Sequence, residues 1–238
     1  MRSFSYFLLG ATMLASVPAA AASLQVTPVL IDVAAEGAAA TTMTLRNTSN
    51  KPAAAQLRVF RWSQSNGQDQ FEETTDVAVS PPMVDMKANG EYVIRIVRTN
   101  RAPIRGEESY RLVADELPDA AAKGTGTVNL LVRHSVPVFF HGASATPADV
   151  KWTIARGNGR ITLQGQNDGD RRLRVSRLKA TDASGSVANY GDGLVGYVLG
   201  KSSVSFPARP VARAFSGAAA TLSLSSESGQ TAATASIR

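Results

Sequence analysis

The chain of 238 residues contains no cysteine and only two histidines, His134 and His141. The lack of cysteine excludes disulfides, thiolate metal sites and cysteine nucleophiles. The two histidines lie an odd number of positions apart on one predicted strand, so they point to opposite faces of it. We therefore expect no metal site and no cofactor, and we interpret both histidines as structural.

Long apolar runs are also missing after the first 22 residues. Residues 1–22 combine a charged start at Arg2, an apolar stretch from Tyr6 to Val17, and small residues before Ser23. The apolar stretch is shorter than the about 20 residues that span a bilayer. This pattern is typical of a cleavable signal peptide, so we expect an exported chain that begins at Ser23 and has no stable membrane insertion.

Motifs for catalysis are equally scarce. Glu107 and Glu108 are adjacent, so they face opposite ways on a strand, and Glu72-Glu73 lies beside a predicted loop. The chain has no Gly-x-Ser-x-Gly motif of the kind that carries a serine nucleophile. These absences favour a protein that is not an enzyme. A periplasmic hydrolase stays an alternative, which would need a convergent polar site.

The net charge is +6, and the positive residues are densest in one short segment. Its members are Arg171, Arg172, Arg174, Arg177 and Lys179. Such a cluster can contact nucleic acid or an acidic partner. Because apolar residues alternate with it, we favour a solvated strand face, and export argues against a nucleic-acid partner.

The exported part of the chain has the pattern of an all-β protein. Turn-forming residues recur roughly every ten positions, as in sandwiches and barrels. Leu24–Val33, Gln56–Trp62 and Tyr92–Arg98 have the composition of strands. The small residues of 142–147 offer little to bury, as in a linker. We predict two β-sandwich domains, formed by residues 23–141 and 148–238.

The longest apolar strand is predicted over Thr127–Phe140, and Val128, Leu130 and Val132 form one row on it. A strand that is apolar on both faces is normally central and buried. An edge strand with such a row would instead offer main-chain hydrogen bonds and side chains to a partner. The residues alone leave both interpretations open.

Several short stretches are weak indicators of a protein family when taken singly, but their order and spacing together are more specific. They are Ser23–Pro28, Met43–Asn47, Ser80–Pro82, Asn89-Gly90 followed by Val93–Ile96, Glu107–Leu112 with Glu116–Pro118, and Ser135–Phe140. Together they resemble the PapD-like family of periplasmic pilus-assembly chaperones, most closely its archaic, spore-coat-like branch. The resemblance extends over nearly the whole exported chain and is strongest over 23–141.

The resemblance implies two immunoglobulin-like sandwiches arranged as an L or boomerang. It implies a periplasmic, non-enzymatic chaperone that binds fimbrial (pilin) subunits by donor-strand complementation and delivers them to an outer-membrane usher. The donated row would be Val128, Leu130 and Val132. The alternative is a structural or adhesive subunit of the fimbria itself, which would lack one strand.

One departure concerns the cations that hold the C-terminal carboxylate of the subunit in the best-known members. The matching positions in this chain are Pro28 and Pro137. By sequence, the nearest candidates for the carboxylate anchor are Arg95, Arg98 and Arg133.

A second departure concerns the charged cluster that the family places between its domains. Glu108 matches the glutamate of that cluster, and His141 occupies the position of its arginine. We therefore expect these two residues at the domain interface, with the domain angle held in a different way.

Overall fold

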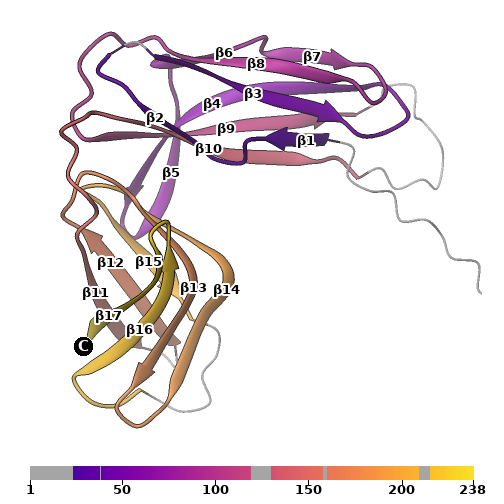
Figure 1. The fold of residues 1–238 in the computed structure, drawn as a ribbon. Helices are drawn as coiled ribbons and strands as arrows, with labels where there is room; N and C mark the ends of the chain where they lie inside the picture. Colours follow the sequence, from indigo (N-terminus) through magenta and orange to yellow (C-terminus); the bar gives the residue numbers. More distant parts are fainter. Residues whose placement is uncertain (1–23, 38, 119–129, 158–159, 209–214) are drawn as a thin grey trace, which may run out of the picture.

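The computed structural model describes residues 24–37, 39–118, 130–157, 160–208 and 215–238. Every regular element in these ranges is a β-strand, which confirms the predicted all-β fold. The strands form two bodies set at an angle, residues 24–141 in the upper part of Figure 1 and residues 150–237 in the lower part. Over the same ranges, no helix is long and apolar enough to cross a membrane.

The first body consists of two sheets packed face to face. Its strands are β1 (Leu24–Thr27), β2 (Ile31–Ala34), β3 (Ala39–Asn47), β4 (Ala53–Ser65), β5 (Gln68–Glu73), β6 (Val77–Ser80), β7 (Met83–Met86), β8 (Glu91–Arg98), β9 (Glu107–Leu117) and β10 (Arg133–His141). One sheet has the order β1-β3-β8-β6, and the other has the order β2-β10-β9-β4-β5, with β7 beside β4.

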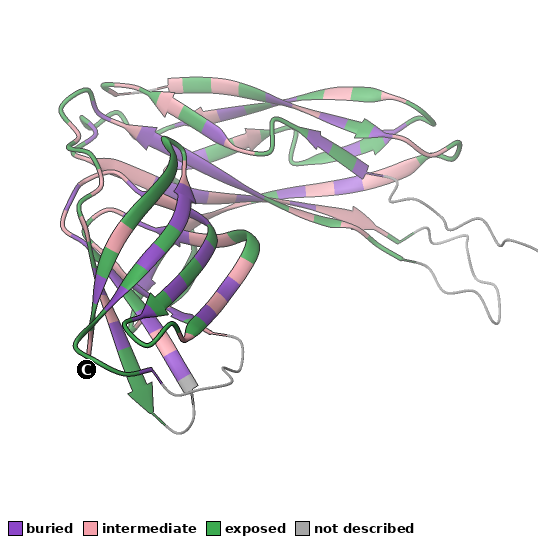
Figure 2. Cartoon of the chain, turned by 60° about the horizontal axis from the view of Figure 1, so that its bottom comes forward, coloured by how far each residue is buried: buried purple, intermediate pink, exposed green. Residues whose placement is uncertain are grey.

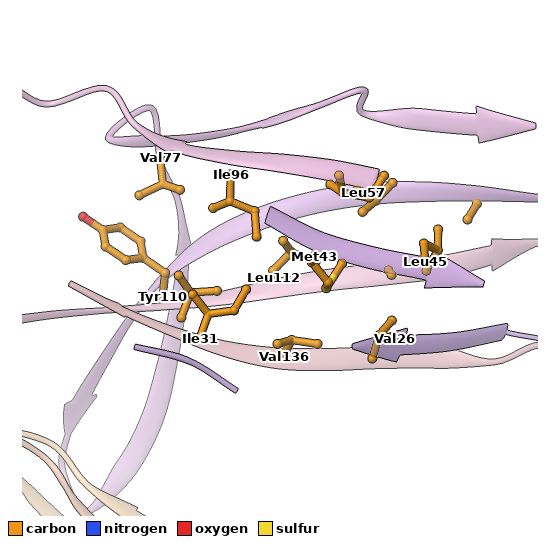
Figure 3. Close-up of a cluster of buried hydrophobic side chains, with 14 of the residues drawn as sticks. Val26, Ile31, Met43, Leu45, Leu57, Val77, Ile96, Tyr110, Leu112 and Val136 are labelled. Carbon is orange, nitrogen blue, oxygen red and sulfur yellow. The ribbon is translucent and has the colours of Figure 1, made fainter. Parts of the chain in front are cut away.

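Alternation along each strand builds the core between these sheets. On β3, Met43 and Leu45 are buried while Thr42 is exposed, and Figure 2 shows the same alternation along other strands. In Figure 3, Leu57 and Leu112 of the second sheet meet the β3 side chains in the middle of the sandwich. Each such side chain stabilises the fold by about 1.5–3 kcal/mol, so the alternation fixes which face of each strand remains outside.

The segment predicted as one strand over Leu24–Val33 is divided between the two sheets. β1 pairs antiparallel with β3, whereas β2 pairs in parallel with β10 in the opposite sheet. Pro28 follows β1 directly and has no N–H to continue a ladder. The chain therefore crosses the sandwich at residues 28–30, and β2 covers only the last part of β10.

The second body is one strongly curved sheet. Its strands are β11 (Val150–Gly157), β12 (Arg160–Asn167), β13 (Leu173–Asp182), β14 (Val187–Val198), β15 (Ser203–Pro207), β16 (Ala219–Ser226) and β17 (Gly229–Ile237). The order is β14-β13-β16-β17-β11-β12-β15, and a Cβ on Gly196 of β14 would lie 3.0 Å from the Phe206 ring of β15. The two end strands therefore approach each other. The expected linker 142–147 falls between β10 and β11, and the domain limits drawn there stay a prediction.

Candidate functional site

The strand predicted over Thr127–Phe140 is shorter in the structure, because β10 begins at Arg133 and ends at His141. Val132 still accepts a hydrogen bond from the Glu116 N–H, but its own N–H donates to the Glu116 carboxylate at 3.1 Å. A side chain thus replaces the backbone partner and ends the ladder with β9. Leu130 precedes the strand, and Val128 lies outside the described residues.

One edge of β10 is open at its beginning. β9 pairs with β10 from Arg133 to His141, whereas β2 pairs with it only from Val138 to His141. Within the described ranges, residues 133–137 therefore have no strand on the side away from β9. An open edge of this kind is a template for pairing with another chain.

Apolar side chains gather around this open edge. Leu130 is 79% exposed and Leu131 is 50% exposed, whereas Val132 packs partly against the core of the first body. Val29 is also strongly exposed, at the crossing between β1 and β2. Exposed apolar groups beside unpaired backbone mark a surface that a protein partner can cover.

A further cation, not predicted from the sequence, lies where the two bodies meet. Arg111 on β9 is the register partner of Pro137 on β10 and of Phe60 on β4. Its guanidinium lies over the Trp62 ring, with 3.9 Å between the guanidinium carbon and the ring centroid, and 5.8 Å from the Tyr197 ring of the second body. This stacking leaves the edges of the planar guanidinium for hydrogen bonding.

Arg111 is only partly exposed, and burial lowers the pKa of its guanidinium from the ordinary value. Its Nε is buried and has no hydrogen-bond acceptor among the described residues, and the same holds for Nε1 of Trp62. Two buried donors without acceptors thus lie on adjacent side chains. Buried donors carry a free-energy cost unless a partner satisfies them, so this corner is suited to an anion.

The three cations predicted as anchors lie in different places. Arg95 is exposed on β8, in the sheet that does not contain β10. Arg133 is on β10 itself, where its Nε forms an ion pair with Asp115. Arg98 is 1% exposed, and Nε and a terminal nitrogen donate to the two oxygens of Glu108, both at 2.8 Å. Arg98 is thus an internal cation of the first body, with its donors already used.

Glu108 correspondingly lies inside the first body, which corrects its expected place between the domains. It accepts from Arg98 and, at 3.0 Å, from the Tyr110 hydroxyl. Burial alone would raise the pKa of Glu108, but these hydrogen bonds outweigh burial and the pKa is lowered. His141 does lie near the interface, with its Nε2 3.5 Å from Asp32 Oδ1.

The interdomain ion pairs are centred on Arg172, which precedes β13 in the second body. It donates to Glu107 at 2.6 Å and to Asp32 at 2.9 Å, both in the first body, and to Glu227 at 3.1 Å. Arg171 adds a contact with Asp32 at 3.0 Å. The prediction that this basic cluster is a solvated strand face is therefore wrong for Arg171 and Arg172. Their partners are so distant in sequence that no sequence pattern links them.

Aromatic side chains complete the contact between the two bodies. Trp62 and Phe139 of the first body pack with Tyr197 and Leu199 of the second, and Leu30 lies against them. The Trp62 ring meets Tyr197 edge-on, with 5.4 Å between centroids. The platform under the Arg111 guanidinium is therefore built from both bodies.

Comparison with known proteins gives one family and a set of similar folds. The family model described as "Pili and flagellar-assembly chaperone, PapD N-terminal domain" matches residues 23–145. No curated protein matches the chain.

Among solved structures, a chain from the CsuC–CsuE chaperone–tip adhesion subunit complex of the archaic Csu pili of Acinetobacter baumannii is 25% identical, with a TM-score of 0.71. The match covers 91% of this chain and 100% of that one. The Salmonella enterica SafA pilin–SafB chaperone complex matches at 16% identity and TM-score 0.62, over 90% and 97% of the two chains. The E. coli chaperone DraB matches at 20% identity and a TM-score of 0.59, and the match covers 89% of this chain and 95% of DraB. The last two likenesses show a shared fold.

Proposed function

This chain belongs to the family of pili and flagellar-assembly chaperones, as its sequence motifs predicted, and we propose that it binds fimbrial subunits by donor-strand complementation. The observation that carries the proposal is the open edge of β10 at residues 133–137, next to the exposed Leu130. An incomplete subunit sandwich would take this edge and the residues before it as its missing strand.

Burial of apolar side chains and pairing of backbone groups would make such a complex more stable than the separate chaperone and subunit. Covering Leu130 would contribute about 1.5–3 kcal/mol, and Val132 would add a part of that amount because it is already half-buried. The donated backbone would also satisfy the N–H and C=O groups along the edge of the subunit, which otherwise promote aggregation. The predicted row of Val128, Leu130 and Val132 is the proposed contact, and Leu131 and Val29 would flank it.

We propose Arg111 as the anchor for the C-terminal carboxylate of the subunit. Pro28 and Pro137 carry no charge at the usual anchor positions, and Arg111 is the direct neighbour of Pro137 across the ladder. Its stacked guanidinium and free Nε offer charge-assisted hydrogen bonds, each worth about 1.5–3 kcal/mol.

Co-expression with candidate subunits from the same gene neighbourhood tests the donated strand. Leu130→Asp should reduce soluble complex by roughly ten- to hundred-fold, because it places a charge where an apolar pocket is expected. Val93→Asp is the matched control, since Val93 is 65% exposed on β8, in the other sheet. Equal yields of complex with both variants would exclude donation from this strand.

A peptide with the last strand of the subunit tests the anchor. We expect the wild-type chaperone to bind the free carboxylate form more tightly than the C-terminal amide, and Arg111→Gln to bind both forms equally. Arg95→Gln, on the other sheet, should keep the preference. A preference that survives in Arg111→Gln would rule out Arg111 as the anchor.

The remaining steps follow from the family role. We propose export by residues 1–22, action in the periplasm, and delivery of the subunit to an outer-membrane usher without a catalytic step or a cofactor. The alternative of a fimbrial subunit is less well supported, because β10 fills the position between β9 and β2. N-terminal sequencing of the exported protein tests the first step, and Ser23 is the expected start.

A further inference from the structure

The hairpin of β4 and β5 extends from the first domain and lies on the second. In Figure 1, β5 runs down from the upper body to the lower one. At its tip, the Gly67 carbonyl accepts a hydrogen bond from the Ser205 N–H of β15 at 2.9 Å. A Cβ at Gly67 would lie 2.6 Å from the Ser205 hydroxyl, so the close approach depends on glycine.

Gln64, near the end of β4, makes the most specific contact of this hairpin. Its Nε2 donates to the Tyr197 carbonyl at 2.8 Å, and its Oε1 accepts from the Leu199 N–H at 2.9 Å. A carbonyl and an N–H two residues apart point to the same side of a strand. The carboxamide of Gln64 therefore pairs with the end of β14 in the way that a neighbouring strand would.

The site needs a side chain that is both donor and acceptor. The second donor of Nε2 is used by Asp69 Oδ1 at 2.8 Å, and Gln64 is only 9% exposed. A carboxylate in this place would lose the donor to Tyr197 and would face Asp69. An apolar residue would leave a buried N–H and a buried C=O of β14 without partners, which costs free energy.

The same segment supports the proposed anchor. Trp62 lies two residues before Gln64 on the same face of β4, packs edge-on against Tyr197, and carries the Arg111 guanidinium. Tyr197 thus touches the Trp62 ring with its side chain and the Gln64 amide with its backbone. Any shift of β14 relative to β4 would move Tyr197 relative to the Arg111 guanidinium.

We propose that Gln64 is a positioning residue, whose carboxamide fixes the second domain against the β4–β5 hairpin and so holds the side chains around Arg111 in one arrangement before a subunit arrives. The proposal concerns the free chaperone. Its test therefore needs no subunit, and it fails or succeeds independently of the proposed binding activity.

The cysteine-free chain allows a direct measurement of the angle between the domains. Cysteines introduced at the exposed Thr42 of β3 and Ser223 of β16 take one spin label in each domain. Pulsed electron paramagnetic resonance then reports the distribution of distances between the labels. The chain with unaltered Gln64 should give one narrow distribution, and Gln64→Glu should broaden it at neutral pH.

Lowering the pH distinguishes a lost hydrogen bond from general destabilisation, because only the former predicts that the distance distribution of Gln64→Glu narrows again in acid. An ordinary glutamate takes up its proton near pH 4.3, and burial together with Asp69, at 2.8 Å from the amide it replaces, raises the pKa of the introduced carboxyl above that value. Arg111, Arg172 and Arg174 are the cations that act on Tyr197, and they oppose the shift in part. Once protonated, the carboxyl can again donate to Tyr197, so the distribution should narrow toward that of the wild type at the same pH.

Two further variants complete the experiment. Gln70→Glu adds the same charge at an exposed position of β5 and should leave the distribution narrow. Gln64→Met keeps the length without hydrogen bonds and should broaden it at every pH. A narrow distribution in both Gln64 variants would overturn the proposal, and so would a broadening in Gln64→Glu that acid does not reverse while the protein remains folded.

Discussion

Arg172→Met removes a buried guanidinium on which three carboxylates converge. Arg172 and Glu107 are each 1% exposed at the side chain and lie 2.6 Å apart, so water does not replace Arg172 when it is lost, and the more distant Arg171, at 3.6 Å, is the cation that remains beside Glu107. Removing one member of such a buried pair costs about 3–5 kcal/mol. For a chain of this size, the loss corresponds to a fall in Tm of roughly 6–20 °C. Urea denaturation followed by circular dichroism measures the free energy of unfolding.

The pH dependence of the stability of this variant tests whether the unpaired Glu107 carboxylate causes the loss of stability. Burial raises the pKa of Glu107, and the charge and hydrogen bonds of Arg172 oppose that rise, so the pKa should rise further without Arg172. A carboxyl with a raised pKa in the folded state contributes stability below its unfolded pKa and loses that contribution as the pH rises through the folded value. Arg172→Met should therefore regain stability as the pH falls from about 7 toward about 5.

The double variant Arg172→Met with Glu107→Gln is the decisive control. It leaves no buried charge at this position, while Asp32 and Glu227 stay partly exposed at 29% and 44% of their side chains. We expect it to recover much of the lost stability at neutral pH and to lose the pH dependence. A loss in the single variant of less than about 1 kcal/mol, as for an exposed ion pair, would refute the reasoning. A double variant as unstable as the single one would refute it too.

Three smaller tests address other parts of the fold. Arg98→Met should cost about 3 kcal/mol in urea denaturation, the lower end of the range for buried pairs, because the Glu108 carboxylate, 15% exposed at its side chain, loses its cation; a change below 1 kcal/mol, which is about the value for exposed pairs, would contradict this. Gly67→Ala should lower Tm more than Gly217→Ala, since both have a positive φ but only the first meets a side chain closely. Asp182→Asn should destabilise the protein at neutral pH, because the backbone hydrogen bond from Ser216 is the main cause that lowers the pKa of Asp182. A group with a lowered pKa loses its contribution as the pH falls through the folded value, so the difference from wild type should begin to shrink below about pH 4, and a constant difference in Tm would refute this account.

The fold itself was accessible from the sequence because its signals are local. Alternation over Gln56–Trp62 and Tyr92–Arg98 corresponds to strands within β4 and β8, and Asn66-Gly67 lies at the tip of the β4–β5 hairpin. The limits of the predicted strand over Leu24–Val33 were less accessible. A crossing between sheets depends on which neighbours each half finds, and those neighbours are distant in sequence.

The contacts between the domains were not accessible for the same reason. Arg172 meets Asp32, which lies 140 positions earlier in the sequence, and no periodicity relates the two residues. Family resemblance directed attention to Glu108, whose partner in this chain is Arg98 of the same domain. A matching motif identifies the residue at a position, but the contacts of that residue depend on the rest of the chain.

The alternation of side chains along β9, however, separates the residues that face the core from Glu107 and Arg111. Tyr110 and Leu112 are core residues, so even positions on this strand face the core of the first body and odd positions face the other side of the sheet. Parity alone therefore assigns Glu108 to the interior and Glu107 and Arg111 to the opposite face, and the structure shows that this face meets the second domain. One side of a single strand thus carries both the ion pair that joins the domains and the proposed anchor for the subunit. Because both lie on the same ladder, a change in the domain contact at Glu107 should reach Arg111 through the sheet as well as through the aromatic platform.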